Sequence, residues 1–255
     1  MSERPSPGQY PRSDEYSRFS ENLRSTRRAR NALDSLHKAA IRRNSAPEIE
    51  TLAEVQYLYL GIEAEALLRK ILFDPTGFSL EERLQLLNER SQINRWLAVV
   101  SAAFSKHYLG TLINQLDIKQ LEPDLRNRYQ SIRDMLDLQL RPIIEDRNKL
   151  AHAQAIWQLK SGSESDFKSM QSKISFGDHW NLTYLQKSLS LIGEIVLILV
   201  VSKPTFERDF ASLIHKFAAA KQNVEDNSNG AMYEKYKQSL PPIRPRRPQS
   251  DDPTN

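Results

Sequence analysis

The sequence predicts an all-α protein, and three observations carry that prediction. Glycine makes up only 8 of the 255 residues, which is too few for the many tight turns of a β-sandwich or barrel. Between about 17 and 224, apolar residues recur at intervals of three and four, the period of one helix face. No strand–helix–strand unit can be recognised. We therefore expect a bundle of about six helices with disordered termini.

The first two helices are predicted from apolar spacing and from signals at their ends. An amphipathic helix is expected at about 17–44, and a second one from 45 to about 73, where a turn containing proline and glycine stops it. Between them, Ser45 and Glu48 have the spacing of a capping box, in which each side chain binds a free backbone amide of the first turn. Pro47 fits that first turn because its missing N–H is not needed there.

The helical pattern continues through the rest of the chain. Ser79 and Glu82 form a second capping box, which opens a segment predicted to run to about Tyr108. Pro123 fits the first turn of the next helix, and Pro142 is expected to kink or restart it. The remaining predicted segments are a helix from 143 to about 155, a polar loop over 160–179, and closing helices at about 181–202 and 204–224.

We expect one α-helical domain over residues 17–225, between a disordered N-terminal tail (1–16) and a disordered C-terminal tail rich in proline and arginine (226–255). The most apolar stretch, 182–201, is interrupted by a lysine and a glutamate. It therefore predicts a helix buried in the protein and not a membrane span. The N-terminus lacks the apolar segment of a secretory signal, which favours a cytoplasmic location.

Several kinds of chemistry lack the residues they require. The chain has no cysteine, which removes disulfides, thiolate metal sites and cysteine nucleophiles. None of the five histidines pairs with another at metal-ligand spacing, so no metal or other cofactor is expected. Carboxylate pairs such as Glu63 and Glu65 point to different helix faces, and we interpret them as surface or ion-pair residues.

The first predicted helix is strongly basic. From Arg18 to Arg43 it carries eight lysines and arginines against two acidic residues, whereas the net charge of the whole chain is +4. Such a surface attracts polyanions through phosphate contacts that carry no sequence information. We therefore expect Arg27, Arg28 and Arg30 to contact the backbone of a nucleic acid, although a charged helix side is often merely solvated.

One combination of residues suggests a reaction. Arg147 and Asn148 precede His152 in the segment 144–154, IEDRNKLAHAQ. Arginine can bind two phosphate oxygens at once, the amide can fix orientation, and an imidazole can move a proton near neutral pH. These residues, named the RN-H motif below, suit the cleavage of a phosphodiester, in which the 2′-hydroxyl of RNA can itself attack phosphorus.

Spacing alone does not single out this motif, because short patterns recur by chance. Arg30 with His37, and Arg208 with His215, are separated by six residues and are rival pairs. The context decides between them. The string DRNKLAH, followed by Trp157, resembles the signature of the HEPN superfamily of small α-helical domains: an arginine, a polar residue that is most often asparagine, and a histidine after four to six residues.

This resemblance implies a bundle that dimerises so that two motifs face each other, forming a composite, metal-independent endoribonuclease site of the toxin or defence type. It implies that Arg147 binds the phosphate, His152 acts as acid or base, and Asn148 orients them, with an antitoxin or regulatory protein as a further partner. HEPN toxins silenced by nucleotidylation carry a tyrosine two residues after the histidine. The residue here is Gln154, which departs from that pattern.

Two other interpretations stay open. A HEPN-like module without catalysis would bind RNA or a partner protein through the basic helix. A plain helical scaffold would pair Arg147 with a carboxylate and use His152 at a helix end. On an ideal helix, Asn148 and His152 share a face, whereas Arg147 and His152 lie about 140° apart. That offset favours a site assembled from two subunits of a symmetric dimer.

Overall fold

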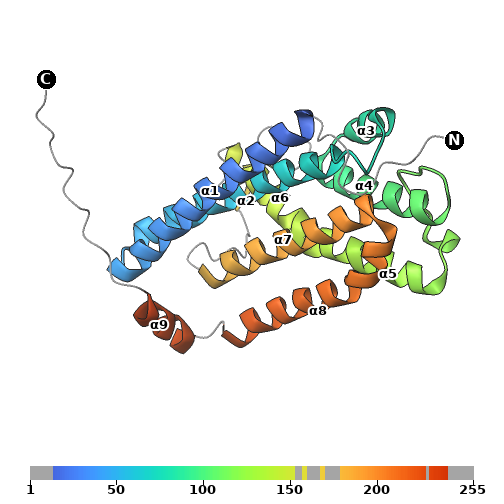
Figure 1. The fold of residues 1–255 in the computed structure, drawn as a ribbon. Helices are drawn as coiled ribbons and strands as arrows, with labels where there is room; N and C mark the ends of the chain where they lie inside the picture. The colour runs from blue at the N-terminus through green and yellow to red at the C-terminus, as the bar shows by residue number, and fades with distance from the viewer. Residues whose placement is uncertain (1–13, 153–156, 160–166, 170–178, 228–229, 241–255) are drawn as a thin grey trace, which may run out of the picture.

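The computed structural model describes residues 14–152, 157–159, 167–169, 179–227 and 230–240, and in this part of the chain the fold is a helical bundle (Figure 1). The all-α prediction is therefore confirmed. The α-helices are α1 (Asp14–Arg43), α2 (Ala46–Leu72), α3 (Leu80–Leu87), α4 (Gln92–Tyr108), α5 (Pro123–Met135), α6 (Arg141–Ala151), α7 (His179–Val201), α8 (Lys203–Asn227) and α9 (Gly230–Ser239). A short 3-10 helix, η1 (Ile118–Gln120), and a π-helical turn, η2 (Leu136–Leu140), lie beside α5, and strands β1 (Trp157–Leu159) and β2 (Phe167–Ser169) form an antiparallel pair.

Helix α2 is the centre of the bundle. It forms a long hairpin with α1 and also packs against α6 and α7, while α7 packs against α4 and α8 (Figure 1). The core between these helices is filled by large side chains with almost no exposed surface, among them Trp96, Phe104, Tyr129 and Phe206. Because α2 contacts both α1 and α6, it fixes the position of the basic helix and of the helix that carries the RN-H motif.

One of the two predicted capping boxes is confirmed and the other is wrong. The backbone N–H of Glu82 donates to Ser79 Oγ at 3.2 Å, and the N–H of Ser79 donates to Glu82 Oε2 at 2.6 Å. At the start of α2, Ser45 makes no capping bond with its side chain. Glu48 instead forms an ion pair with Arg43 across the tight α1–α2 turn, which draws its carboxylate away from the Ser45 backbone.

The number of helices exceeds the predicted six, because the described residues contain nine α-helices. The segment predicted to run from 79 to 108 is two helices, α3 and α4, since Ser91 Oγ accepts the N–H of Asn94 at 3.1 Å and starts a new helix. Helix α9 lies inside the range predicted as a disordered tail. The ring of Tyr236 on α9 stacks on that of His179, a tertiary contact that sequence periodicity does not reveal.

The expected disturbance at Pro142 takes the form of the π-helical turn η2, which directly precedes α6 and its proline. Proline cannot donate a backbone hydrogen bond, and its ring crowds the carbonyl four residues earlier. A widened turn before the proline relieves that crowding and lets α5 continue into α6. The fold therefore carries the motif helix as a continuation of α5.

Helix α7 is the most apolar helix. Its segment Asn181–Val201 is long and apolar enough to cross a membrane by length and composition, but 61% of that window is buried inside the bundle. This agrees with the predicted buried helix. Parts of the predicted polar loop (160–166 and 170–178) and of both predicted tails (1–13 and 241–255) lie outside the described residues.

Candidate active site around Arg147

Helix α6 places Arg147 against α2. Ile143 and Ile144 are buried and anchor the helix in the bundle, while the Arg147 side chain is 22% exposed. Its Nη2 donates hydrogen bonds to Glu65 Oε2 at 3.1 Å and to Gln92 Oε1 at 3.2 Å. One residue from α2 and one from the start of α4 therefore orient the guanidinium.

A glycine on α2 makes room for this arginine. A Cβ atom on Gly61 would lie 2.5 Å from both Cβ and Cγ of Arg147, closer than real Cβ contacts allow. The carbonyl of Gly61 also accepts a weak hydrogen bond from Gln92 Nε2 at 3.5 Å. Sequence reasoning missed Gly61 and Gln92, and the one available signal was an isolated glycine in the interior of a helix.

The ion pair between Arg147 and Glu65 is partly open. Glu65 Oε1 also accepts from Arg69 at 3.2 Å, and the Glu65 side chain is 37% exposed. The Nε–H group of Arg147 is buried and has no hydrogen-bond partner among the residues that the structure describes. Arg147 therefore pairs with a carboxylate, as the plain scaffold would have it, but the pair is partly exposed and Glu65 is shared with Arg69.

Asn148 and His152 lie at the surface. His152 is the residue at which α6 ends, and its backbone N–H donates to the carbonyl of Asn148 at 3.1 Å. Among the described residues, neither the Asn148 nor the His152 side chain forms a hydrogen bond or ion pair, so no such contact joins Arg147 to His152 within one chain. The three motif side chains share one helix end, but only Arg147 is held in place.

The three arginines predicted to bind RNA differ in their surroundings. Arg27 Nε and Arg30 Nη1 donate to the two carboxylate oxygens of Glu63, at 2.8 and 2.5 Å. Glu63 is fully buried, so the interpretation of this residue as an ion-pair member holds and that of a surface residue does not. Arg28 is exposed and, in the described part of the chain, has no such partner.

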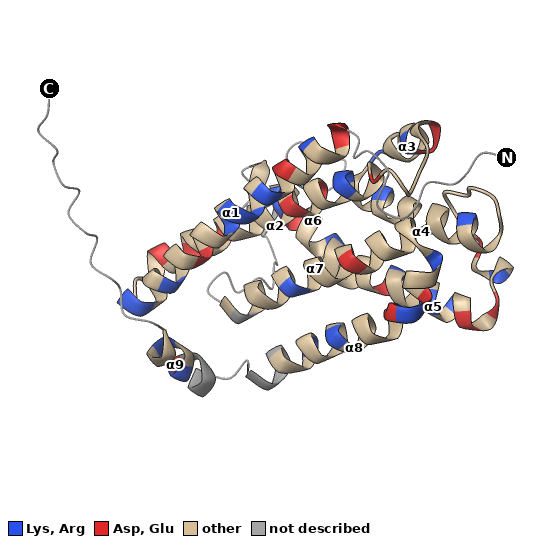
Figure 2. Cartoon of the chain, viewed as in Figure 1, with Lys and Arg blue, Asp and Glu red and all other residues tan. Residues whose placement is uncertain are grey.

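Exposed cations nevertheless gather along α1, where Figure 2 shows lysines and arginines interspersed with a few carboxylates. A shallow hollow of about 300 Å³ opens on this helix. It is lined by Glu21, Arg24, Arg27, Arg28 and Asn31. The surface offers positive charge for a polyanion, although part of the charge of Arg27 is neutralised by Glu63.

Each rival arginine–histidine pair contains a residue that is poorly placed to act on a substrate. His37 has no exposed surface, and its Nδ1 lies 2.8 Å from the amide nitrogen of Gln56. Burial lowers the pKa of His37, although the nearby Asp34 carboxylate acts in the opposite direction. Arg208 makes a fork of two 2.7 Å hydrogen bonds with its neighbour Asp209. A substrate cannot reach His37, and Arg208 is engaged locally.

No family model, curated protein or solved structure matches the chain. Among the described residues, no group of three or more histidine, aspartate and glutamate side chains is placed to hold a metal ion. The chemistry of this site therefore has to be inferred from the RN-H motif and its surroundings.

Proposed function

We propose that the protein is a metal-independent endoribonuclease of the HEPN type, acting as a toxin or defence effector in the cytoplasm. The observation that carries the proposal is the string DRNKLAH at the end of an α-helix in an all-α bundle, with Asn148 and His152 at the surface and Arg147 oriented by Glu65 and Gln92. A guanidinium, an amide and an imidazole at one helix end are the groups that phosphodiester cleavage uses.

In the proposed reaction the 2′-hydroxyl of the substrate attacks the adjacent phosphorus. A bond forms between the 2′-oxygen and phosphorus, and the bond from phosphorus to the 5′-oxygen breaks, which leaves a 2′,3′-cyclic phosphate and a 5′-hydroxyl. His152 accepts the proton of the 2′-hydroxyl or supplies one to the 5′-oxygen. Arg147 neutralises the non-bridging phosphate oxygens, and Asn148 orients the reacting groups.

The site is proposed to be completed by a second copy of the chain. Arg147 is turned toward α2, while His152 lies at the surface, so one protomer does not present both groups together. Two large apolar side chains are exposed on the segments that lead to the motif or pack against it, Ile62 next to Gly61 on α2 (43% exposed) and Leu138 in η2, which precedes α6 (70% exposed). Contact between two copies would cover such side chains and bring two motifs face to face.

The decisive experiment incubates the purified full-length protein with end-labelled RNA in EDTA. We expect cleavage that leaves 2′,3′-cyclic phosphate ends, lost in Arg147→Ala and in His152→Ala. The matched control is His215→Ala, an exposed histidine on α8, which should stay within about tenfold of wild type, or about 1.4 kcal/mol of barrier. Cleavage that persists in both motif variants, or that vanishes in chelator, would overturn the proposal.

A second candidate is a non-catalytic HEPN-like module that binds RNA or a partner protein. It is favoured by the pairing of Arg147 with Glu65, because an arginine already in an ion pair has fewer donors left for a phosphate. In that case the protein would bind RNA through α1 without cutting it, and substitution of Arg147 would leave RNA affinity unchanged.

A further inference from the structure

A cavity of about 350 Å³ lies against the face of α4 that carries Asn94, Leu97 and Ser101. Its volume falls within the range of about 300–1,000 Å³ that is usual for small-molecule pockets. Gln92, which binds Arg147, is two positions from Asn94 and so about 200° around the same helix. The cavity and the candidate active site therefore lie on two sides of the first turn of α4.

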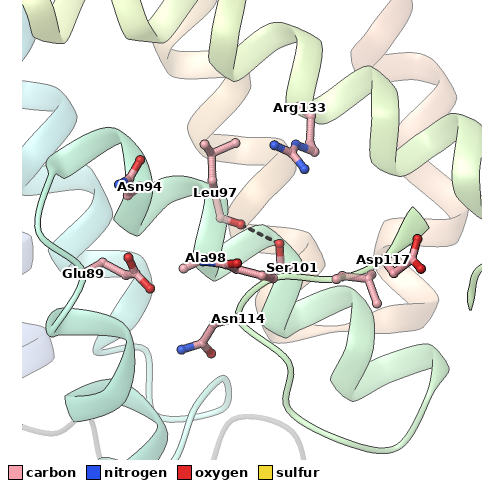
Figure 3. A pocket seen from close by; sticks show the side chains of 10 residues that line it. Glu89, Asn94, Leu97, Ala98, Ser101, Asn114, Asp117 and Arg133 are labelled. Atoms are coloured by element: carbon pink, nitrogen blue, oxygen red, sulfur yellow. Dashed lines mark hydrogen bonds between the residues drawn. The ribbon is translucent and has the colours of Figure 1, made fainter. Parts of the chain in front are cut away.

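The side chains around this cavity are mostly polar and come from separate segments of the chain. In Figure 3, Glu89 and Asn94 lie on one side of the hollow and Asp117 on the other, with Arg133 at the top of the view and Asn114 at the bottom. Glu89 precedes α4, Asn114 and Asp117 belong to the connection between α4 and α5, and Arg133 is on α5. The fold thus brings charged and amide groups together around one space.

Several of these polar groups have no partner within the described part of the chain. The side-chain oxygen of Asn114 is buried and accepts no hydrogen bond, which is costly for a buried polar atom. Asn94 uses its backbone N–H to reach Ser91, and Glu89 uses its backbone carbonyl to accept from Arg95. Their side chains make no such bond within the described residues, so the Glu89 carboxylate and the Asn94 amide can bind a ligand, and the Asn114 oxygen has no protein partner there that a ligand would have to displace.

The orientation of Arg133 at the same cavity is fixed by its neighbours. Its guanidinium lies over the ring of Tyr129 at 5.8 Å from the centroid, and the Tyr129 hydroxyl is 2.8 Å from Ser101 Oγ. Stacking on an aromatic ring fixes the plane of a guanidinium but uses none of its hydrogen-bond donors. Arg133 can therefore donate to a ligand, or stack on one, with little loss of conformational freedom. Leu97 adds an apolar surface.

The balance of donors and acceptors indicates the class of ligand. The Glu89 carboxylate, the Asn114 oxygen and the second oxygen of Asp117, whose Oδ1 already accepts from the Lys119 N–H at 3.0 Å, are the acceptors, while Arg133 and the Asn94 amide are the donors. A flat heterocycle with an exocyclic amino group beside a ring nitrogen or carbonyl matches this set, as the edges of adenine, cytosine and guanine do. The carboxylates of Glu89 and Asp117 repel phosphate, so a base would enter the cavity and its phosphates would remain outside.

We propose that this cavity binds an amino-bearing nucleobase splayed out of single-stranded RNA and thereby selects the nucleotide near the cleaved bond. The effect on cleavage rests on the proposed endoribonuclease function, whereas base binding does not. A helix with its side chains is about 10–12 Å across, and α4 separates the cavity from Arg147. A short stretch of single strand can span that distance.

The first test is calorimetric titration of the full-length protein with adenosine, cytidine, guanosine and uridine. At least one amino-bearing nucleoside should bind ten times more tightly than uridine, which lacks the amino group. Asn114→Leu should abolish that binding without lowering the melting temperature, because the variant removes a buried acceptor that has no partner in the described part of the chain. The matched variant Asn127→Leu, at an exposed position on α5, should bind as wild type does. Equal binding of all four nucleosides, or none, would overturn the proposal.

The second test maps cut sites in a random RNA pool. Asn114→Leu should lose the preference for an amino-bearing base near the cut, whereas Asn127→Leu should keep it. An unchanged cut pattern would overturn the selection. If the wild-type protein binds nucleosides but cuts no RNA, the endoribonuclease proposal fails and the base site stands. If it cuts RNA but binds no nucleoside, the base site alone fails.

Discussion

The guanidinium of Arg147 donates to the carboxylate of Glu65 across the contact between α6 and α2, with 3.1 Å between Nη2 and Oε2. The two residues are 82 positions apart in sequence, so the orientation of the motif arginine depends on how the bundle packs and not on α6 alone. Glu65 is therefore a positioning residue for the proposed reaction. Its substitution should change the cleavage rate and leave the stability of the fold nearly unchanged.

We expect Glu65→Gln to lower the single-turnover cleavage rate about tenfold or more, because the arginine loses the charge that orients it. The melting temperature should hardly change, since a partly exposed ion pair contributes only about 0–1 kcal/mol. Glu50→Gln, at an exposed position on the same helix, is the matched control. Equal rates for the two variants would show that Glu65 does not position Arg147.

Gly61→Ala should displace Arg147 and reduce cleavage, because the new Cβ would lie 2.5 Å from two carbons of that side chain. Overpacking of this kind also destabilises by about 1–3 kcal/mol. Gly193→Ala provides the control, since its Cβ would meet Leu67 at 2.2 Å, in the core between α7 and α2, and would not meet Arg147. Both variants should lose stability, but only Gly61→Ala should lose cleavage in the folded fraction. A similar loss in both would assign the effect to stability.

Substitution of Arg30 should lower the stability of the fold, whereas substitution of Arg28 should weaken RNA binding. Arg30→Gln removes one of the two arginine partners of the fully buried Glu63 carboxylate and, because Arg27 still pairs with it, should cost about 1.5–3 kcal/mol of unfolding free energy, measured in urea. Arg28→Gln should leave stability within about 0.5 kcal/mol. It should nevertheless weaken RNA binding and flatten the slope of log affinity against log salt by up to about 0.7. An unchanged slope would mean that α1 faces a protein partner.

A buried imidazole pair joins four helices. His37 on α1 lies between the amide of Gln56 on α2 and the ring of His179 on α7, whose centroid is 5.2 Å away. His179 Nε2 in turn lies 2.7 Å from the hydroxyl of Tyr236 on α9. Burial, helped by the nearby positive charge of His37 and Lys38, lowers the pKa of His179 to about 4, against the opposing effect of the Asp34 carboxylate.

This pair makes stability depend on pH in a defined window. The unfolded chain protonates each histidine near its ordinary pKa of about 6.5, whereas folded His179 stays neutral down to about 4. The unfolded state therefore binds more protons between these values, and unfolding free energy should fall, by up to about 3 kcal/mol, as pH drops from 6.5 to 4. Urea titrations should show a flatter dependence over this window in His179→Asn. An equal slope in both proteins would contradict the assignment.

Mixing inactive variants tests how a composite site is built. If each site takes Arg147 from one chain and His152 from the other, a heterodimer of Arg147→Ala and His152→Ala restores one complete site, and the mixture regains activity. If each chain keeps its own pair, no activity returns. Sedimentation at the same concentration should show a dimer, and a strictly monomeric profile would contradict the two-chain site.

The sequence predicted best what depends on neighbouring residues. The spacing of apolar side chains located α1 to within three residues at its start, and the Ser79 capping box has the expected bonds. Features that depend on packing were not predictable. The burial of Glu63 reflects two arginines on another helix, and charge patterns otherwise place glutamate at the surface.

The residues of the candidate site were likewise predictable from the sequence only where they are close together in it. Arg147, Asn148 and His152 were found because they form a local string, whereas Gln92 was not, because it reaches Arg147 from a helix that begins 55 residues earlier. The cavity beside Asn114 left no sequence signal either, since its lining comes from Glu89 ahead of α4, from α4 and α5, and from the chain between these helices.

The π-helical turn η2 determines how α6 is rotated about its own axis. A π turn accommodates one residue more than an α turn, and each residue of an α-helix corresponds to about 100° of rotation and 1.5 Å of rise. If one residue were removed from Leu136–Leu140 and the turn closed to an ordinary one, α6 would rotate by about that angle, and Arg147 would no longer face Gly61 and Glu65. A single extra residue in the turn before α6 thus decides whether the arginine meets its partners.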